Sequence, residues 1–221
     1  MTMPGIVSHA TCALNSAAPI DRVDAAVEAC REAMAAAGPG YLPYALWYVS
    51  DAVDAAGSTA AAVVHGRIGL PTFAGAYDMC GGPRSTVGAL KIASTSTMLA
   101  VVVEAGGASA FCFGKAEPNT HEVGGANVTN ADDASGVESV TSALESALES
   151  AECALDDLAM VLVSGYDATA LADSLVLEPS RMLVGSNTAQ LLADGRSLLE
   201  PGSLFAQVVG CDGVDVRMWR R

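Results

Sequence analysis

Residues 98–104 read Met-Leu-Ala-Val-Val-Val-Glu, an unbroken apolar run rich in β-branched side chains. A strand that is apolar on both faces is typical of parallel sheets with helices packed on both sides. Two further runs of this kind lie at 44–50 (Tyr-Ala-Leu-Trp-Tyr-Val-Ser) and 159–164 (Ala-Met-Val-Leu-Val-Ser). These runs predict an α/β protein.

Helical patterns separate the predicted strands. Apolar residues recur every three or four positions after Asp21 and again after Ser135, as they do on the buried face of a helix. The two series are Val23, Val27, Cys30 and Met34, and Val137, Val140, Leu144 and Leu148. Proline is favoured in the first helical position, so Gly81-Gly82-Pro83 predicts the start of another helix over 83–94. Alternating strands and helices predict parallel or mixed sheets with right-handed crossovers.

The order of elements repeats along the chain. Residues 1–106 and 107–221 are each expected to run strand, helix, strand, helix, strand, helix, strand, a βαβαβαβ half, without a repeat at the level of letters. The polar, Gly- and Asn-rich segment 117–134 is longer than ordinary loops and is interpreted as a functional lid or a flexible link. The sequence therefore predicts two similar halves in one compact unit.

The composition excludes several function classes. Hydrophobic residues make up 51% of the 221 residues, and the net charge is −14, with 25 acidic against 11 basic residues. Nucleic acids and anionic membranes attract clustered Lys and Arg, so we expect neither as a partner. The acidity is interpreted as a contribution to solubility or as adaptation to an acid or saline host.

The cysteines indicate a reducing compartment. Their spacing shows neither a zinc-binding pattern nor a C-x-x-C pair, so we expect no metal site and free thiols in the cytoplasm. No signal peptide and no membrane helix is predicted. The six cysteines are Cys12, Cys30, Cys80, Cys112, Cys153 and Cys211.

Several stretches resemble the ketoacyl synthase III type of the thiolase-like condensing enzymes. Near the C-terminus these are residues 179–182 (Pro-Ser-Arg-Met), 185–189 (Gly-Ser-Asn-Thr-Ala), 198–204 (Leu-Leu-Glu-Pro-Gly-Ser-Leu) and 210–214 (Gly-Cys-Asp-Gly-Val). They are similar to the Gly-Asn-Thr segment, the Leu-x-Pro-Gly-Asp turn and the glycine-rich hairpin of that family. A weaker similarity covers two stretches of the first half. Residues 25–38 resemble the family's first helix, and residues 70–90 resemble the strand and helix that carry its nucleophile.

The resemblance implies a thiolase-like αβαβα layered fold and a dimer formed through the first half. It also implies acyl transfer from coenzyme A or an acyl carrier protein through a cysteine thioester, so that the coenzyme A or phosphopantetheine thioester is substrate and no cofactor is needed. The family's usual members are much longer, so the segments that normally cap the active site are expected to be missing. The family's catalytic set is Cys, His and Asn.

The resemblance places the nucleophile at the start of helix 83–94, where a helix dipole stabilises a thiolate. Aligned without gaps, the family's cysteine falls on Pro83, and Cys80 lies three residues earlier. Cys80 is therefore either a nucleophile in a remodelled turn or a buried thiol at a strand end. Ser85 is a weaker substitute because no base is visible for it.

The asparagine is the best match. Asn187 with Thr188 occupies the Gly-Asn-Thr place, where the resemblance implies a hydrogen-bond donor to an oxyanion. Asn is also favoured as a plain helix N-cap, and both interpretations stay open.

The family's histidine is missing. The resemblance places a His-x-x-Asn stretch after strand 159–163, and this chain has Ser164-Gly165-Tyr166-Asp167 there. His121, beside Glu122 in the predicted loop, is a candidate base because its ordinary pKa lies near neutrality; the alternative is a solvated loop histidine. His9 and His65 are expected to be packing or surface residues.

Several basic residues could form the surface that binds an acidic carrier protein. Arg84 and Lys91 lie on the predicted nucleophile helix, and complementary charge steers such encounters. Arg217, Arg220 and Arg221 form a second cluster near the C-terminus, for which the alternative is a solvated tail.

Two functions remain open at this point. The first is a ketoacyl synthase III-like acyltransferase or condensing enzyme that acts on acyl-CoA or acyl carrier protein in fatty acid, polyketide or related biosynthesis, as a homodimer or heterodimer. The second is a non-catalytic relative that partners a complete condensing enzyme or binds an acyl chain.

Overall fold

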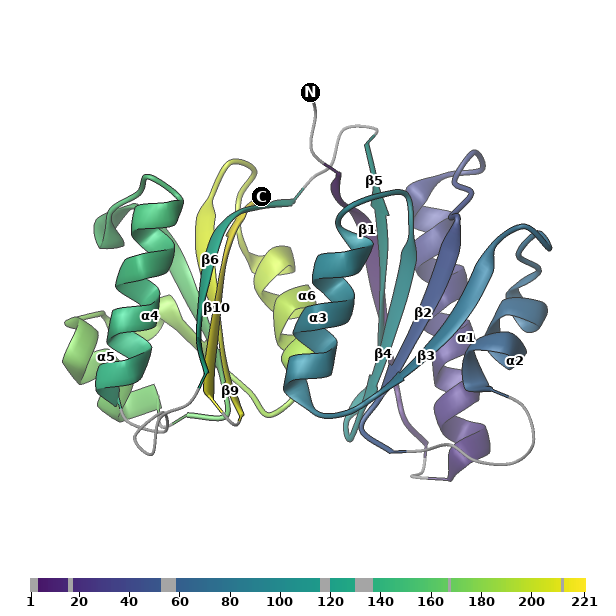
Figure 1. Ribbon diagram of the computed structural model, residues 1–221, viewed down its shortest axis with the longest axis horizontal. Coiled ribbons are helices and arrows are strands. Elements are labelled where there is room, and N and C mark those ends of the chain that lie inside the picture. The colour runs from purple at the N-terminus through teal and green to yellow at the C-terminus, as the bar shows by residue number, and fades with distance from the viewer. Residues whose placement is uncertain are drawn as a thin grey trace. The chain divides into compact units, whose positions relative to one another are not determined.

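The computed structural model describes residues 4–15, 18–52, 59–115, 120–129, 137–166, 168–211 and 213–221. The chain divides into two compact units, Met1–Asn119 and Thr120–Arg221. Each unit holds one five-stranded mixed sheet with helices on both of its faces (Figure 1). The α/β prediction is therefore confirmed.

The first unit has strand order β1-β5-β4-β2-β3. Strands β2, β3 and β4 are mutually parallel, and β5 runs antiparallel to both of its neighbours. Its elements are β1 (Gly5–Ala13), α1 (Pro19–Ala37), β2 (Ala45–Ser50), α2 (Ala60–Ile68), β3 (Gly75–Cys80), α3 (Pro83–Ala93), β4 (Leu99–Glu104) and β5 (Gly107–Gly114).

The second unit repeats this arrangement element by element. Its strand order is β6-β10-β9-β7-β8, again with three parallel strands and an antiparallel pair at one side. Two single 3-10 turns, Leu155–Asp157 and Pro179–Arg181, precede β7 and β8. The elements are β6 (His121–Thr129), α4 (Val137–Ser150), β7 (Leu158–Ser164), α5 (Ala168–Leu175), β8 (Met182–Val184), α6 (Thr188–Leu198), β9 (Leu204–Cys211) and β10 (Gly213–Arg220).

The core of the first unit forms where α1 and α2 cover one face of its sheet. Alternate residues of a strand point to the same face, so Tyr48 and Val101 reach the helices while their neighbours reach the opposite face. They pack with Val27 of α1 and Val64 of α2, and all four side chains are buried. Helix α3 covers the other face (Figure 1). Both faces are thus buried, as the apolar runs predicted.

The second unit has an equivalent core. Leu144 of α4 and Leu171 of α5 pack on Val161, Val163 and Ala206 of the central strands. Helix α6 lies on the other face, where a Cβ on Gly195 would come 2.5 Å from the Leu162 side chain. That contact explains a glycine within a helix, because a larger residue would push α6 off the sheet.

The sequence did not predict β6, and it expected a first strand in the 1–106 half without locating β1. Segment 117–134 was expected to be a loop, yet residues 121–129 form β6 and pair with β10 along its length. Of the rest of that predicted loop, Thr120 is described, and residues 117–119 and 130–134 lie outside the described residues. Strand β5 belongs to the first sheet, since it pairs with β1 and β4. The units therefore divide at 119/120 and not at 106/107, and each half is βαβαβαββ.

Most helix starts agree with the sequence. Asn187 and Gly82-Pro83 stand where α6 and α3 begin. Asp21 lies in the first turn of α1 rather than at its cap, which is Ala18. The predicted cap Ser135 lies outside the described residues. Among the helices that the structure describes, none is long and apolar enough to cross a membrane.

Candidate functional site

In an α/β sheet, ligands usually bind on the side where the parallel strands end. We call this side the carboxyl edge of the sheet, and the side where the parallel strands begin its amino edge. In the first unit β2, β3 and β4 end together at Ser50, Cys80 and Glu104. Ser50 and Cys80 are register partners, and the Gly81 N–H donates to the Ser50 carbonyl at 2.9 Å. The sequence-predicted thiol therefore lies at the edge where a ligand is expected.

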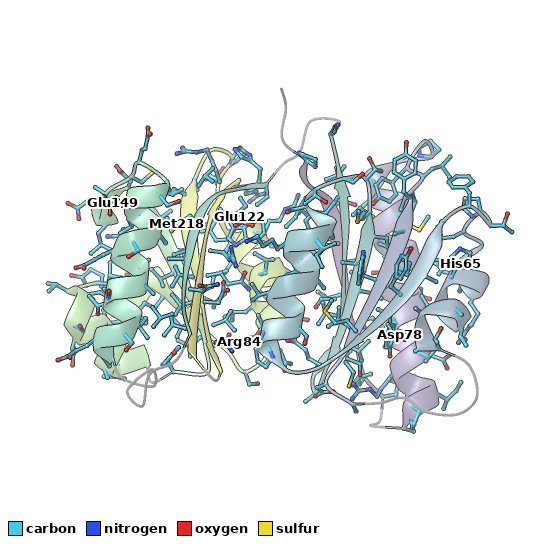
Figure 2. All side chains as sticks on the ribbon, in the orientation of Figure 1. His65, Asp78, Arg84, Glu122, Glu149 and Met218 are labelled. Carbon is cyan, nitrogen blue, oxygen red and sulfur yellow. The ribbon has the colours of Figure 1, made fainter. Side chains whose placement is uncertain are left out.

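Cys80 is exposed, and its orientation follows from the strand. Asp78 accepts a hydrogen bond from the Ala61 N–H at 3.0 Å, so its side chain points to the face that carries α2 (Figure 2). Cys80 is two residues further along β3 and points to the same face. Helix α3 covers the opposite face (Figure 1). The thiol therefore does not lie on the N-terminus of α3, where the resemblance placed the nucleophile.

The turn into α3 is open and short. Gly82 is the N-cap residue and Pro83 opens the helix, without a side-chain capping bond. The Ser85 hydroxyl packs against Gly81, because a Cβ there would lie 2.2 Å from Ser85 Oγ. Arg84 stands at the start of α3 (Figure 2), and Arg84 and Lys91 are both exposed. Their seven-residue spacing places them on one face of the helix.

A buried arginine that the sequence analysis missed fixes the same edge. Arg22 Nη2 donates to Ser50 Oγ and to Asp51 Oδ1, both at 2.6 Å, although only 7% of Arg22 is exposed. It also contacts the Val103 carbonyl at 3.4 Å. This residue ties the first turn of α1 to the ends of β2 and β4. The sequence feature that could have indicated this contact is an arginine placed among the apolar residues of the first helix.

In the second unit Asn187 stands at the equivalent strand-to-helix turn. It is the N-cap residue of α6 with φ −100° and ψ 108°, and its carbonyl accepts from the Leu191 N–H at 3.0 Å. Its side chain makes no capping hydrogen bond. The backbone therefore has the N-cap position, but capping does not use the side-chain amide.

Behind Asn187 lies a buried polar network. Ser164 Oγ at the end of β7 is 3.3 Å from Thr188 Oγ1, and Gln207 Nε2 donates to the Thr188 carbonyl at 3.0 Å. Gln207 is 1% exposed, and its Oε1 has no hydrogen-bond partner among the described residues. Ser164 is the first residue of the stretch where the resemblance placed His-x-x-Asn, so the end of β7 and the Asn187 turn do meet.

Two glycines make this edge compact. Gly165 has φ +80°, and a Cβ there would lie 2.4 Å from the Gly210 carbonyl oxygen. The Tyr166 hydroxyl donates to the Gly213 carbonyl at 3.2 Å. The chain after β7 is thus held against the β9–β10 hairpin by direct backbone contact.

His121 lies in strand β6 and not in a loop, which corrects the sequence expectation. It pairs with Arg220, which pairs with Leu204, which in turn pairs with Leu158 at the start of β7. Burial and the nearby Arg220 charge lower its pKa. Ser164 is six residues further along β7, a distance of about 20 Å. His121 and Asn187 therefore lie at opposite edges of their sheet.

The other two histidines also lie toward the amino edge of their sheet. His9 is in register with Phe111, which is in register with Ala100, the second residue of β4. His65 Nε2 lies 3.1 Å from the Ala74 carbonyl, just before β3. Since the chain has three histidines, each unit lacks a histidine at its own carboxyl edge.

No family model and no curated protein matches the chain by sequence. An OleA variant from Xanthomonas campestris superposes with a TM-score of 0.83 at 13% identity, over 100% of this chain and 98% of that one. The chain has the thiolase-like fold.

Two further structures agree with that fold. The 3-oxoacyl-(acyl carrier protein) synthase III, FabH, from Xanthomonas oryzae pv. oryzae gives a TM-score of 0.81 at 15% identity, over 99% of each chain. A second OleA variant, solved with cerulenin, gives 0.79 at 15% identity, over 98% of this chain and 96% of that one. The thiolase-like likeness thus runs along the whole chain, while the identity is too low to carry site residues across.

Proposed function

We propose that this thiolase-like chain handles acyl thioesters of coenzyme A or of an acyl carrier protein, taking the acyl group on Cys80. We also propose Asn187, at its own turn in the second unit, as a hydrogen-bond donor to a ligand oxygen. The pathway class we propose is fatty acid, polyketide or related biosynthesis. The proposal does not include histidine-assisted condensation.

One observation carries this proposal. Cys80 and Asn187 stand in the equivalent turn of each unit, the one from the third strand to the third helix; Cys80 ends the strand β3, and Asn187 is the N-cap residue of α6. Those turns lie at the carboxyl edges of the parallel strands, where α/β sheets bind ligands. Cys80 is exposed and the Asn187 side chain is not used for capping, so both groups are available to a ligand.

The proposed step is a thiol–thioester exchange. The Cys80 sulfur attacks the thioester carbonyl carbon, and the carbon–sulfur bond to coenzyme A or phosphopantetheine then breaks. The thiol proton passes to the leaving sulfur, so the products are an acyl-Cys80 thioester and a free thiol.

Condensation is left out because of where the histidines lie. A general base must lie within hydrogen-bond reach of the proton that it takes. Neither unit has a histidine at its own carboxyl edge, and Ser164 holds the place that the resemblance assigned to the family's histidine. Acyl uptake on a thiol does not need that group.

The proposed protein partners are inferred from the charge of α3 and from the outermost strand of the first sheet. Arg84 and Lys91 present two positive charges on one exposed face of α3, which suits an acidic carrier protein. Strand β3 is an edge strand paired only with β2, and Tyr77 on it is 50% exposed. An unpaired edge with exposed aromatic residues favours association, so we propose a homodimer, or a heterodimer with a related synthase. The five free cysteines among the described residues suit the cytoplasm.

Intact-mass measurement after incubation with acetyl-CoA and longer acyl-CoAs tests the proposal. The wild-type chain should gain the mass of one acyl group, and Cys80→Ala should not. Cys153→Ala is the matched control, since that thiol is only half-buried and lies in the other unit. An adduct that persists in Cys80→Ala, or no adduct with any thioester, would reject Cys80 as the acceptor.

A non-catalytic role is the second candidate, favoured by the orientation of Cys80 away from α3. A chain of this kind would bind an acyl group or accompany a complete condensing enzyme without forming an adduct. Purification from the native host would distinguish the two. A full-length synthase that co-purifies with the wild-type chain, in the absence of any acyl adduct, supports this second function.

A further inference from the structure

A cavity of about 550 Å³ lies in the first unit, away from the carboxyl edge. The segment between α1 and β2 forms much of its wall, with further residues from β1 and from the ends of two other strands. Its size is that of a small-molecule site. The lining residues used below are Val7, Pro39, Tyr41, Leu42, Thr97 and Lys115.

The wall is held in place by Tyr41. Its hydroxyl donates to the Met98 carbonyl and lies 3.2 Å from the Phe113 carbonyl, at the points where β4 begins and β5 ends. Burial is the main cause that raises the pKa of this phenol, so it stays a neutral donor. The Tyr44 N–H donates to the Thr97 carbonyl at 2.9 Å. These bonds fix the 38–44 segment against the sheet, so the cavity is preformed.

The chemistry of the lining is apolar with one charge. Val7, Pro39 and Leu42 contribute apolar surface, and Lys115 is the one charged residue of the lining. Lys115 is exposed and makes no ion pair with any residue that the structure describes. The C-terminus of α1 at Ala37 carries a partial charge of about −0.5. Lys115 therefore supplies the positive charge of the lining, next to that partial negative charge.

We propose that this cavity binds a small amphipathic anion, an alkyl chain that ends in one carboxylate. The alkyl chain would pack against the apolar wall, and the carboxylate would meet Lys115. A chain of net charge −14 repels anions in general, so an anion site needs both the local lysine and apolar burial.

The site is separate from the proposed acyl site. Thr97 precedes β4 and the 38–44 segment precedes β2, so the cavity lies at the amino edge of the sheet, whereas Cys80 lies at the carboxyl edge. The inference therefore does not depend on acyl transfer. A Cys80→Ser chain should bind the anion as the wild type does.

Isothermal titration calorimetry with hexanoate, octanoate and decanoate tests the apolar part. The step from hexanoate to octanoate should tighten binding by up to about tenfold, because each fully buried methylene contributes about 0.8 kcal/mol. The step to decanoate should add less, since the wall residue Leu42 is itself 57% exposed. Leu42→Asp should weaken octanoate binding at least tenfold, since Leu42 is 57% exposed and the change removes apolar wall and adds a like charge. Leu198→Asp, at a similarly exposed leucine in the second unit, is the matched control.

Octan-1-ol tests the charged part. The wild type should prefer octanoate to octan-1-ol about threefold, the size expected for one exposed ion pair, and Lys115→Ala should lose that preference. Lys91→Ala should keep it. Affinity that does not rise with chain length, or octanoate binding that survives Leu42→Asp unchanged, would overturn the site. Loss of binding in Cys80→Ser would place the anion at the acyl site instead.

Discussion

The two strand-to-helix turns, β3 to α3 and β8 to α6, have the same place in the same topology and are built differently. In the first unit the turn is Cys80-Gly81-Gly82-Pro83, with an exposed thiol and no side-chain cap. In the second unit the turn rests on the buried Ser164, Thr188 and Gln207 hydrogen bonds. One turn presents an exposed thiol, and the other is supported by buried hydrogen bonds and leaves the Asn187 amide out of capping.

The difference separates accessibility from preorganisation. A nucleophile must be reached by its substrate, whereas a donor to a developing charge works only when its position is fixed in advance. Duplicated halves supply two equivalent turns, and each can serve one of those needs. The substitutions below test whether the second turn is in fact the more tightly built one.

The largest expected effect is at Gly165 of the second unit. Gly165→Ala should lower the free energy of unfolding by about 3 kcal/mol, because its positive φ is strained for alanine and the new Cβ would collide with the Gly210 carbonyl. Gly82→Ala in the first unit is the control, since a Cβ there meets nothing within 4 Å. Urea denaturation of both variants measures the contrast. Equal losses would mean that the chain after β7, beside the second turn, is packed no more tightly than the β3–α3 turn.

The sequence predicted the central strands and most helices because their signals are local. Continuous apolar runs marked β2, β4 and β7, and capping residues marked α3 and α6. It did not locate β1 and it missed β6; both strands contain polar or glycine residues and lie at sheet edges. Their pairing partners are far away in the chain, as Gly5 with Gly114 and His121 with Arg220 show. Missing β6 also moved the predicted division of the halves.

The candidate site could be predicted only in part. The resemblance supplied Asn187 and its turn, and the strand end supplied Cys80. The face to which Cys80 points depends on the register of β3 with β2, and the opposite-edge position of His121 depends on three successive strand pairings. Arg22 and Gln207 were missed because their roles depend on contacts between elements that no local pattern reports.

A smaller effect is expected at Gln207. Gln207→Met loses one hydrogen bond to Thr188 but also removes a buried acceptor without a described partner, so the free energy of unfolding should stay within about 1 kcal/mol of wild type. Gln207→Ala should cost more, about 2 kcal/mol, because it leaves a cavity. Thermal unfolding of both variants compares them. A large loss in Gln207→Met would show that Oε1 has a partner, such as a bound water.

The smallest effect concerns pH and His121. Its pKa is lowered in the fold by burial and by Arg220, so the unfolded chain takes up the proton first as pH falls. The stability from this group is present above the ordinary value of about 6.5 and is lost at lower pH. The melting temperature of wild type should therefore fall slightly more between pH 7 and pH 5 than that of His121→Gln. Arg220→Gln, which removes one cause, should lie between them, and parallel curves would contradict this.

The mass that the chain gains from acyl-CoA, compared in wild type, Cys80→Ala and Cys153→Ala, tests the central claim most directly. The account predicts one acyl group on the wild type and on Cys153→Ala and none on Cys80→Ala, because the exposed thiol at the end of β3 is the proposed acceptor. An adduct of the same mass on Cys80→Ala would contradict the claim that the open β3–α3 turn presents the acceptor.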